Sequence, residues 1–314
     1  MPSFKDNDYP MVVETLIELP EDDRELLHGI CELHVHANPD LRRRSFTELD
    51  LAKQMRDVGY RAVLFKNHHM INADRVQIIS KIVPGIQVFG GVALNYAVGG
   101  INPSAVEAAI GFGAKEVWMP TLDAANQIRK IDLAGYPKGT AEAATRPRPK
   151  VEGISILDPS SELIPQVGEV LGLVADADII LGTGHLSLEE TFPLVKAARH
   201  AGVRKILITH PGWEPTDWPS ESLVKLVEMG AILEYCFHCS MPYWYRLDPR
   251  RIVEMVGRVG AEKCVIATDF GHPQMPHPID GMRLFIRVLE ALGITEAEID
   301  TMARRIPAKF LGLE

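Results

Sequence analysis

The strongest constraint on the fold is a repeated alternation of short apolar runs with longer amphipathic segments, which extends from residue 29 to the end of the chain. Runs rich in Val, Ile and Leu predict strands that are buried on both faces. Eight such runs span residues 29–36, 61–66, 87–95, 115–121, 178–184, 205–210, 231–236 and 263–269. Helical patterns follow several of them and end at glycines such as Gly202, Gly230 and Gly260. This punctuation is typical of α/β units.

Eight α/β units favour a closed (β/α)8 TIM barrel, with an open doubly wound sheet as the alternative. Barrels of this kind often reach the 314 residues of this chain as one domain, so residues 1–314 are predicted to form a single unit. Helices are expected over residues 46–58, 104–110, 188–201, 220–229 and 249–259. Thr47 is the expected cap of the first of these helices, and Gly59 its end.

Two segments interrupt this rhythm. Residues 1–28 form an N-terminal extension ahead of the first strand, and residues 124–167 form an insertion between strands 4 and 5. The insertion is rich in Gly, Pro and Ala, and its short apolar pieces flank Asp158-Pro159-Ser160-Ser161, which predicts a hairpin. Because long loops in compact domains are typically lids or oligomer contacts, we expect a lid and a homo-oligomer.

Composition limits which binding partners and which cellular compartment we expect. The formal net charge of -9 argues against a nucleic-acid surface. The run Arg42-Arg43-Arg44 is either a solvated loop or a clamp for an anionic substrate. Four cysteines include one lone C-x-x-C, which indicates a reducing compartment. The polar N-terminus and the lack of a run of about 20 apolar residues predict a soluble, cytoplasmic protein without a membrane span.

The histidines are placed unevenly along the chain. Eight of the 11 lie at or just past predicted strand ends: His34, His36, His68, His69, His185, His210, His238 and His272. In a (β/α)8 barrel the carboxyl ends of the strands converge on one pocket. His34 and His36 are two apart on a strand, so both side chains face one side, where they suit a divalent cation such as zinc. An isolated H-x-H is equally typical of structural histidines.

The pattern extends beyond this pair. His185 closes strand five, His210 closes strand six, and Asp269 closes strand eight. This order resembles the amidohydrolase superfamily of metal-dependent barrel hydrolases, which takes H-x-H from strand one, His from strands five and six, and Asp from strand eight. The resemblance covers nearly the whole chain. Residues 306–313 are also similar to the terminal N-P-A-x-x-L-G-L helix of that family, with Ile306 in place of the usual Asn.

The resemblance implies specific roles for these residues. His34, His36 and Asp269 would hold a first metal, while His185 and His210 would hold a second metal or contact the substrate. Asp269 would also act as general base toward metal-bound water. One or two ions are expected, with zinc first, although Mn, Fe, Ni and Co suit the same ligands.

Lys66 marks a departure from the family pattern. Many members bridge two metals with a carboxylated Lys or a Glu from strand four, but that strand ends here at Trp118-Met119-Pro120-Thr121. Lys66 instead closes strand two, next to the strand of His34 and His36. It is therefore a candidate carboxylated bridge, an ammonium that grips a substrate carboxylate, or a solvated loop lysine.

Other polar residues near strand ends are candidates for substrate contact or for structural hydrogen bonds. They are Arg42, His69, Asn95, Glu234, His238 and His272. Aromatic residues in the loops after strands six and seven either wall a substrate pocket or pack the loops together: Trp213, Trp218, Tyr243, Trp244 and Tyr245.

The leading functional prediction is hydrolysis of an amide, cyclic amide or lactone of a small molecule by metal-activated water. A metal-dependent decarboxylase or hydratase of a small carboxylic acid is the first alternative, and a phosphoesterase is another. A metal-binding protein without turnover would lack a base near the metal, whereas Asp269 supplies one. The sequence contains no motif that specifies the substrate.

Overall fold

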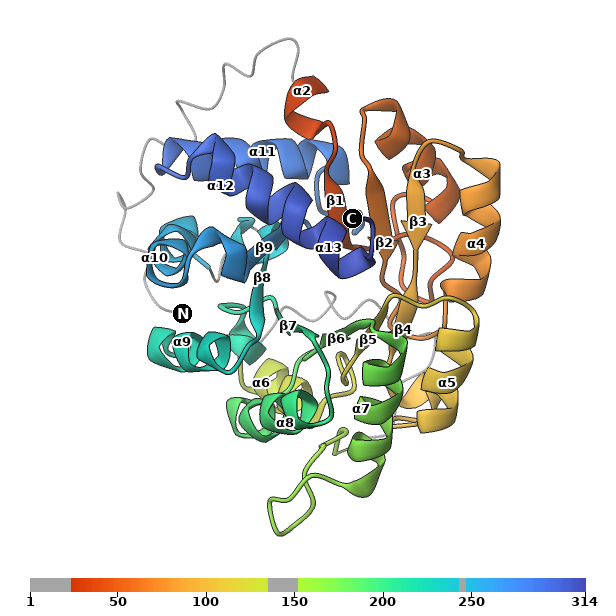
Figure 1. Ribbon diagram of the computed structural model, residues 1–314, viewed down its shortest axis with the longest axis vertical. Helices are drawn as coiled ribbons and strands as arrows, with labels where there is room; N and C mark the ends of the chain where they lie inside the picture. Colours follow the sequence, from red (N-terminus) through yellow and green to blue (C-terminus); the bar gives the residue numbers. More distant parts are fainter. Residues whose placement is uncertain (1–23, 135–151, 243–246) are drawn as a thin grey trace.

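Strands and helices alternate along residues 24–134, 152–242 and 247–314, which the computed structural model describes (Figure 1). The strands are β1 (Cys31–Val35), β2 (Ala62–Phe65), β3 (Gln87–Phe89), β4 (Gly91–Ala93), β5 (Glu116–Trp118), β6 (Ile180–Gly182), β7 (Lys205–Thr209), β8 (Ile232–Cys236) and β9 (Cys264–Ala267). The helices are α2 (Arg24–Leu27), α3 (Glu48–Asp57), α4 (Ala73–Ile82), α5 (Pro103–Gly111), α6 (Ala125–Ala134), α7 (Pro165–Ala177), α8 (Leu188–His200), α9 (Ser220–Glu228), α10 (Pro249–Val259), α11 (Pro278–Ala291), α12 (Glu296–Asp300) and α13 (Ile306–Leu311). Short 3-10 turns are η1 (Tyr96–Val98), η2 (Glu214–Thr216), η3 (Phe237–Ser240) and η4 (Ala261–Lys263), and η5 (Thr301–Arg305) is a π-helical turn.

The strands form two parallel sheets in sequence order, β1-β2-β3 and β4 to β9. The predicted α/β class is confirmed, and each predicted strand run contains a strand. The run 87–95 differs, because it is split at Gly90 into β3 and β4. Asn72 causes the split: its Nδ2 donates to Phe65 O at 2.8 Å, and its Oδ1 accepts from Gly91 N at 2.8 Å. A Cβ at position 90 would lie 2.4 Å from this Oδ1, so only glycine fits there.

Backbone hydrogen bonds also connect the first strand with the segment after the last one. Asp269 N donates to His34 O at 2.8 Å, and His36 N donates to Phe270 O at 2.8 Å. A parallel bridge pairs Val35 with Phe270. The carboxyl ends of β1 and β9 are therefore side by side.

Side chains of the two sheets form a second apolar cluster, separate from the main core. Its buried members are Cys31, Leu33, Ala62, Leu64, Ala93, Trp118, Ile180, Leu207 and Val265 from the strands, with Ala308, Phe310 and Leu311 from α13. Figure 1 shows α13 near the centre of the view, among the strands. Helix α13 thus supplies part of this interior cluster.

Trp118 is the largest side chain of this interior cluster, and it depends on a glycine opposite. A Cβ at Gly182 of β6 would lie 2.6 Å from Trp118 Cδ1 and 2.5 Å from Glu116 Oε1. Both distances are shorter than a Cβ tolerates. The absence of a side chain at Gly182 is what admits Trp118 and Glu116 to the interior.

The predicted helices are present with small shifts at their ends. Thr47 caps α3 as predicted, since its side chain accepts from Asp50 N. The sequence did not predict α6 within the insertion, because the Gly- and Pro-rich residues that follow obscured its pattern. Further on, an antiparallel bridge joins Leu157 and Leu163, so the chain reverses where the hairpin was expected. Residues 1–23 and 135–151 lie outside the described residues, so the extension and the lid stay predictions.

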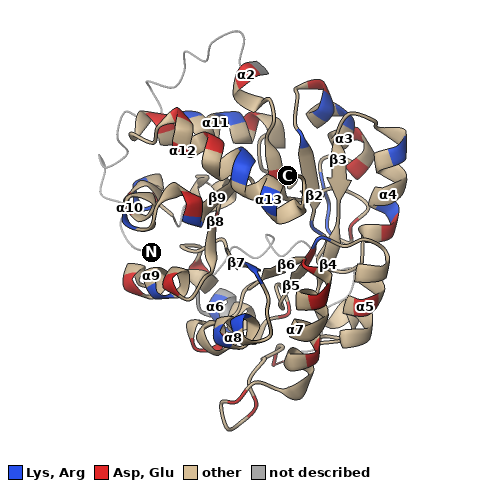
Figure 2. Cartoon of the chain, viewed as in Figure 1, with Lys and Arg blue, Asp and Glu red and all other residues tan. Residues whose placement is uncertain are grey.

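Lys and Arg are interspersed with Asp and Glu on the surrounding helices (Figure 2). Among the described residues, the structure contains no helix that is both long and apolar enough to cross a membrane.

A candidate metal centre at the carboxyl ends of the strands

His34 and His36 reach the site because β1 is irregular. The register between β1 and β2 shifts between Glu32 and Val35. Neighbouring residues of a regular strand point to opposite faces. Here Leu33 and His34 both face the interior: Leu33 belongs to the interior cluster, and the ring centroid of His34 lies 6.3 Å from that of Trp118. Irregularities of this kind redirect side chains near functional sites.

Three predicted ligands meet at one point. His34 Nε2 lies 3.3 Å, and His36 Nε2 3.0 Å, from the same Asp269 oxygen, Oδ1. All three residues are buried, and each offers a ligand atom within 4.8 Å of the others. Two imidazoles and a carboxylate are an ordinary ligand set for a divalent transition metal.

Hydrogen bonds on the far side of each ring fix how these imidazoles are protonated. His36 Nδ1 lies 2.8 Å from Lys66 O, and a carbonyl only accepts, so Nδ1 carries the proton. The lone pair of Nε2 then faces the Asp269 carboxylate. Burial lowers the pKa of His36 to about 3, so a second proton on this ring is disfavoured. Two lone pairs at 3.0 Å need a cation between them, and a metal ion fits this requirement.

His34 has the same arrangement. Its Nδ1 lies 3.2 Å from Glu234 Oε2 in the middle of β8, while its Nε2 points to Asp269. Metal-binding histidines usually donate their other ring nitrogen to a carboxylate or carbonyl. Glu234 therefore fits as the residue that orients His34.

His185 and His210 form a second pair, carried by the loops after β6 and β7. Their Nε2 atoms lie 3.0 Å apart. Burial holds the pKa of both imidazoles well below the usual value, so both rings are neutral. Each Nδ1 is buried without a hydrogen-bond partner in the described residues. Trp213 packs against both rings, with centroid distances of 4.9 Å.

Two of the converging residues have unusual backbones. The φ angle is 31° at His210 and 54° at Asp269, in the left-handed region that side chains other than glycine rarely adopt. Such conformations cost about 1–3 kcal/mol each and cluster at functional sites. This strain supports a functional role for both residues.

The charge of Asp269 is set by its neighbours. Burial alone would raise its pKa, but the imidazoles of His34, His238 and His36 bring the pKa well below the usual value. His238 Nδ1 lies 3.6 Å from the second oxygen, Oδ2. Asp269 is therefore a carboxylate at neutral pH and can accept a proton.

Lys66 lies beside the same centre and is buried. Its Nζ is 3.1 Å from His34 Nε2 and 5.3 Å from the centroid of the Trp118 ring. Burial lowers the pKa of Lys66, although Asp269, Glu234 and Glu116 counteract this effect. Because Lys66 is buried, it is not a solvated loop lysine. Two candidate roles remain: a carboxylated bridge between two metals, and an ammonium that binds a substrate carboxylate.

The other predicted residues surround this centre. His69 Nδ1 is 3.1 Å from Asp40 Oδ1, and His272 Nε2 is 2.9 Å from Arg44 Nη1. Asn95 Nδ2 donates to His68 O at 2.9 Å, which indicates a structural hydrogen bond. Arg42 is half-buried, and its proposed contact with substrate stays a prediction, as do those of His69, Asn95, His238 and His272.

Several residues at the site were not singled out from the sequence. His68 stacks on His36 with ring centroids 4.7 Å apart, although it had been counted only among the strand-end histidines. Glu116 of β5 is buried, with no hydrogen-bond partner for either carboxylate oxygen in the described residues, and its pKa is raised well above the usual value by burial. Its position at the start of β5, away from the carboxyl end of the strand, gave no signal. Tyr243, Trp244 and Tyr245 lie outside the described residues.

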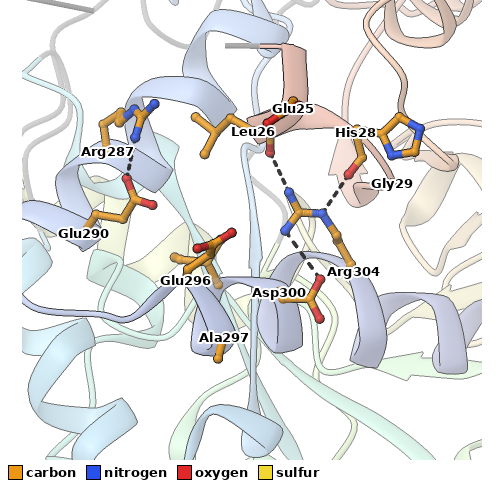
Figure 3. A pocket seen from close by; sticks show the side chains of 11 residues that line it. Glu25, Leu26, His28, Gly29, Arg287, Glu290, Glu296, Ala297, Asp300 and Arg304 are labelled. Atoms are coloured by element: carbon orange, nitrogen blue, oxygen red, sulfur yellow. Dashed lines mark hydrogen bonds and ion pairs between the residues drawn. The ribbon is translucent and has the colours of Figure 1, made fainter. Parts of the chain in front are cut away.

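A separate cavity of about 860 Å³ lies at the start of β1, away from this centre (Figure 3). It is lined by residues that precede β1 and by parts of α11, α12 and η5. Arg304 donates to the carbonyls of Leu26 (2.6 Å) and His28 (2.7 Å) and lies 3.7 Å from Asp300. Arg287 pairs with Glu290 at 2.9 Å.

Comparison with solved structures identifies the fold class. An amidohydrolase from Pseudomonas aeruginosa matches with a TM-score of 0.60 and 12% identity, over 92% of this chain and 99% of that one. A PTE-like lactonase mutant from Deinococcus radiodurans gives 0.58 and 11%, over 91% and 97%. A putative 2-pyrone-4,6-dicarboxylic acid hydrolase from Pseudomonas putida gives 0.53 and 15%, over 91% and 98%. The chain therefore shares the fold of these structures, as the resemblance of its histidine pattern predicted.

The chain belongs to the family of unknown function DUF6282, whose model matches residues 29–234. That range includes His34, His36, Lys66, His185 and His210, while Asp269 lies beyond it. A comparison with curated proteins finds no match.

Proposed function

We propose that this protein is a metal-dependent hydrolase that acts on an amide, cyclic amide or lactone bond of a small organic molecule. His34, His36 and Asp269 would hold one divalent cation, with zinc first among the candidates, and His185 and His210 would hold a second. A bound divalent cation supplies Lewis acidity and lowers the pKa of water to about 7. The observation that carries the proposal is the meeting of His34 Nε2 and His36 Nε2 at one oxygen of Asp269, at 3.3 and 3.0 Å.

In this proposal Asp269 has a second role as the proton acceptor for the attacking water. Its carboxylate is ionised, and its Oδ1 lies 3.3 Å from His34 Nε2 and 3.0 Å from His36 Nε2. General-base assistance of this kind contributes about 10²–10⁴-fold to a rate. If the site holds a single cation, one of His185 and His210, whose Nε2 atoms lie 3.0 Å apart, would instead contact the substrate.

The proposal includes a closed (β/α)8 barrel. The two hydrogen bonds between β1 and the segment after β9, with the split strand β3/β4 counted as one, support closure of the ring. Closure matters for the chemistry because it holds His34 and Asp269, which are far apart in the sequence, against each other.

We further propose that Lys66 is carboxylated and bridges two cations. An uncharged amine adds CO2 and releases a proton to give an anionic carbamate. Burial favours the uncharged amine of Lys66, and Nζ already lies 3.1 Å from His34 Nε2. The anion would supply the bridging ligand that the end of β5 lacks.

A metal-dependent lyase that decarboxylates or hydrates a small carboxylic acid is the second candidate. It is favoured by two buried basic side chains near the centre, Lys66 and Arg44. A fold does not decide between hydrolysis and lyase chemistry. The lactonase and the pyrone-dicarboxylic acid hydrolase among the similar structures support the proposal that a lactone is hydrolysed.

The test combines metal analysis of the purified protein with a turnover panel of lactones, cyclic amides, linear amides, phosphate esters and carboxylic acids. We expect one or two equivalents of a transition metal and hydrolysis of a lactone or amide, abolished by a chelator and restored by zinc. Release of CO2 or water from an acid, without hydrolysis, would replace the hydrolase proposal with the lyase. Cytoplasmic location and a homo-oligomer stay predictions.

A further inference from the structure

The loop after β1 presents Arg44 to the site on a fixed backbone. Asn38 N donates to Phe46 O at 2.8 Å, and Glu48 N donates to Asn38 O at 2.8 Å, so the two ends of the loop are held together. Next to Arg44, Ser45 N donates to Gly271 O at 3.0 Å. The loop is thus attached to the segment that carries Asp269 and His272.

The guanidinium of Arg44 is buried and incompletely paired. Nε donates to Asp40 Oδ2 at 2.7 Å, and Nη1 lies 2.9 Å from His272 Nε2. Nη2 is buried and has no partner among the described residues. A buried charged donor left without an acceptor is energetically unfavourable. This cost calls for an acceptor that binds there.

Neighbouring residues do not supply that acceptor. Asp40 Oδ1 already accepts from His69 Nδ1 and from Arg42 N, each at 3.1 Å, while Oδ2 is taken by Arg44 Nε. Asp40 therefore holds the guanidinium in place through Nε but does not accept from Nη2. Nη2 is therefore the one nitrogen of this guanidinium that lacks an acceptor among the described residues.

The guanidinium lies close to the candidate metal ligands. The ring of His272, which contacts Arg44, has its centroid 6.3 Å from that of His36 and 6.2 Å from that of His238. Burial and, after it, the charge of Arg44 lower the pKa of His36 and of His272. A small molecule that contacts Arg44 would reach the reacting centre beside His36.

We infer that Arg44 is a specificity-determining residue that binds the carboxylate of a small organic acid substrate. The inference rests on the proposed function for the position of the reacting centre. A guanidinium matches the planar carboxylate and retains its charge when buried. One free nitrogen suits a carboxylate better than a phosphate dianion, which needs more donors.

The three consecutive arginines provide matched controls. Arg43 is exposed and Arg42 half-buried, whereas the side chain of Arg44 is buried. Arg43→Met removes the same charge one residue away. Arg44→Lys keeps the charge but cannot contact Asp40, His272 and a ligand together, and it serves if Arg44→Met fails to fold.

The experiment is calorimetric titration of the metal-loaded protein with linear dicarboxylates from malonate to adipate, with benzoate, and with the neutral diamide glutaramide. We expect at least one carboxylate to bind the wild type at least tenfold more tightly than Arg44→Met. The carboxylate affinity of Arg43→Met should stay within twofold of the wild-type affinity, and that of Arg44→Lys should be at least fivefold lower. Glutaramide should bind weakly to all variants. Thermal unfolding checks that each variant is folded.

Equal carboxylate affinity in the wild type, Arg44→Met and Arg44→Lys would overturn the inference. So would equal weakening by Arg43→Met, or no carboxylate binding by the wild type. Binding of inorganic phosphate in place of every carboxylate would contradict the proposed ligand class. Because the titration does not depend on turnover, anion binding that requires Arg44 without hydrolysis of any lactone or amide would retain the inference while removing the proposed hydrolase.

Discussion

The candidate metal centre and the cavity at the start of β1 differ in how their polar groups are paired. In the cavity of about 860 Å³, Arg304 and Arg287 bind carbonyls and carboxylates of neighbouring residues (Figure 3). At the metal centre the Nδ1 atoms of His185 and His210 and the Nη2 of Arg44 are buried without partners in the described part of the chain.

A large cavity therefore need not be the place where side chains are arranged to bind a ligand or to react. Polar groups that satisfy one another stabilise a fold, whereas buried groups without partners need an explanation, such as a catalytic role, a water or a bound ion. The carboxyl-end position agrees, since active sites of (β/α)8 barrels lie at that end.

The largest effect is expected for His34→Ala. The variant loses the imidazole that contacts Asp269 and Lys66, so metal content and activity should both fall below detection while the protein stays folded. His28→Ala, beside the cavity, should change neither. Elemental analysis and circular dichroism check this prediction, and full metal occupancy in His34→Ala would remove His34 from the ligand set.

Asp269→Asn should lower kcat/KM by about 10²–10⁴-fold, because an amide does not accept a proton from water. Asparagine tolerates the left-handed backbone at this position, so the fold should survive. Asp300→Asn makes the same change in the cavity and should leave kcat/KM within twofold. A similar loss in both variants would point to a general effect on stability.

Lys66→Ala should lower the metal content from two equivalents toward one, with partial rescue of activity by short carboxylic acids. Removal of the carbamate takes away the bridging anion, and a small carboxylate can replace it. Lys309→Ala, at an exposed position of α13, is the control. Unchanged metal stoichiometry with a raised KM would assign Lys66 to the substrate instead.

The smallest effect on activity is expected in the cavity itself. Arg304→Met removes the hydrogen bonds to Leu26 O and His28 O, so the free energy of unfolding should fall by about 1–3 kcal/mol. The kcat/KM value should stay within twofold. Chemical denaturation and steady-state kinetics measure the two quantities, and a tenfold fall in kcat/KM would give the cavity a functional role.

Much of the fold and part of the site could be predicted from the sequence, because strand ends are local features. A strand that ends in His or Asp brings that residue to the common end of a parallel ring, wherever it lies in the chain. The convergence of His34, His36 and Asp269 followed from this rule. The split of the run 87–95 did not, because it depends on Asn72, which approaches from another segment.

The surroundings of the site depend on side-chain paths that periodicity does not encode. Three consecutive arginines look alike in sequence, and only the attachment of the loop at Asn38 and Ser45 distinguishes Arg44. Glu234 was one of several polar residues near strand ends until its contact with His34 Nδ1 separated it from the others.

The close contact of Gly182 with Trp118 constrains the order in which this sequence can change over evolutionary time. Any larger residue at position 182 would collide with the indole of Trp118. Such a substitution is therefore not expected in a sequence that keeps this tryptophan. A smaller residue at 118 must come first, and it would open an internal void of its own. The two positions are therefore expected to be inherited as a pair, even though they lie far apart in the chain.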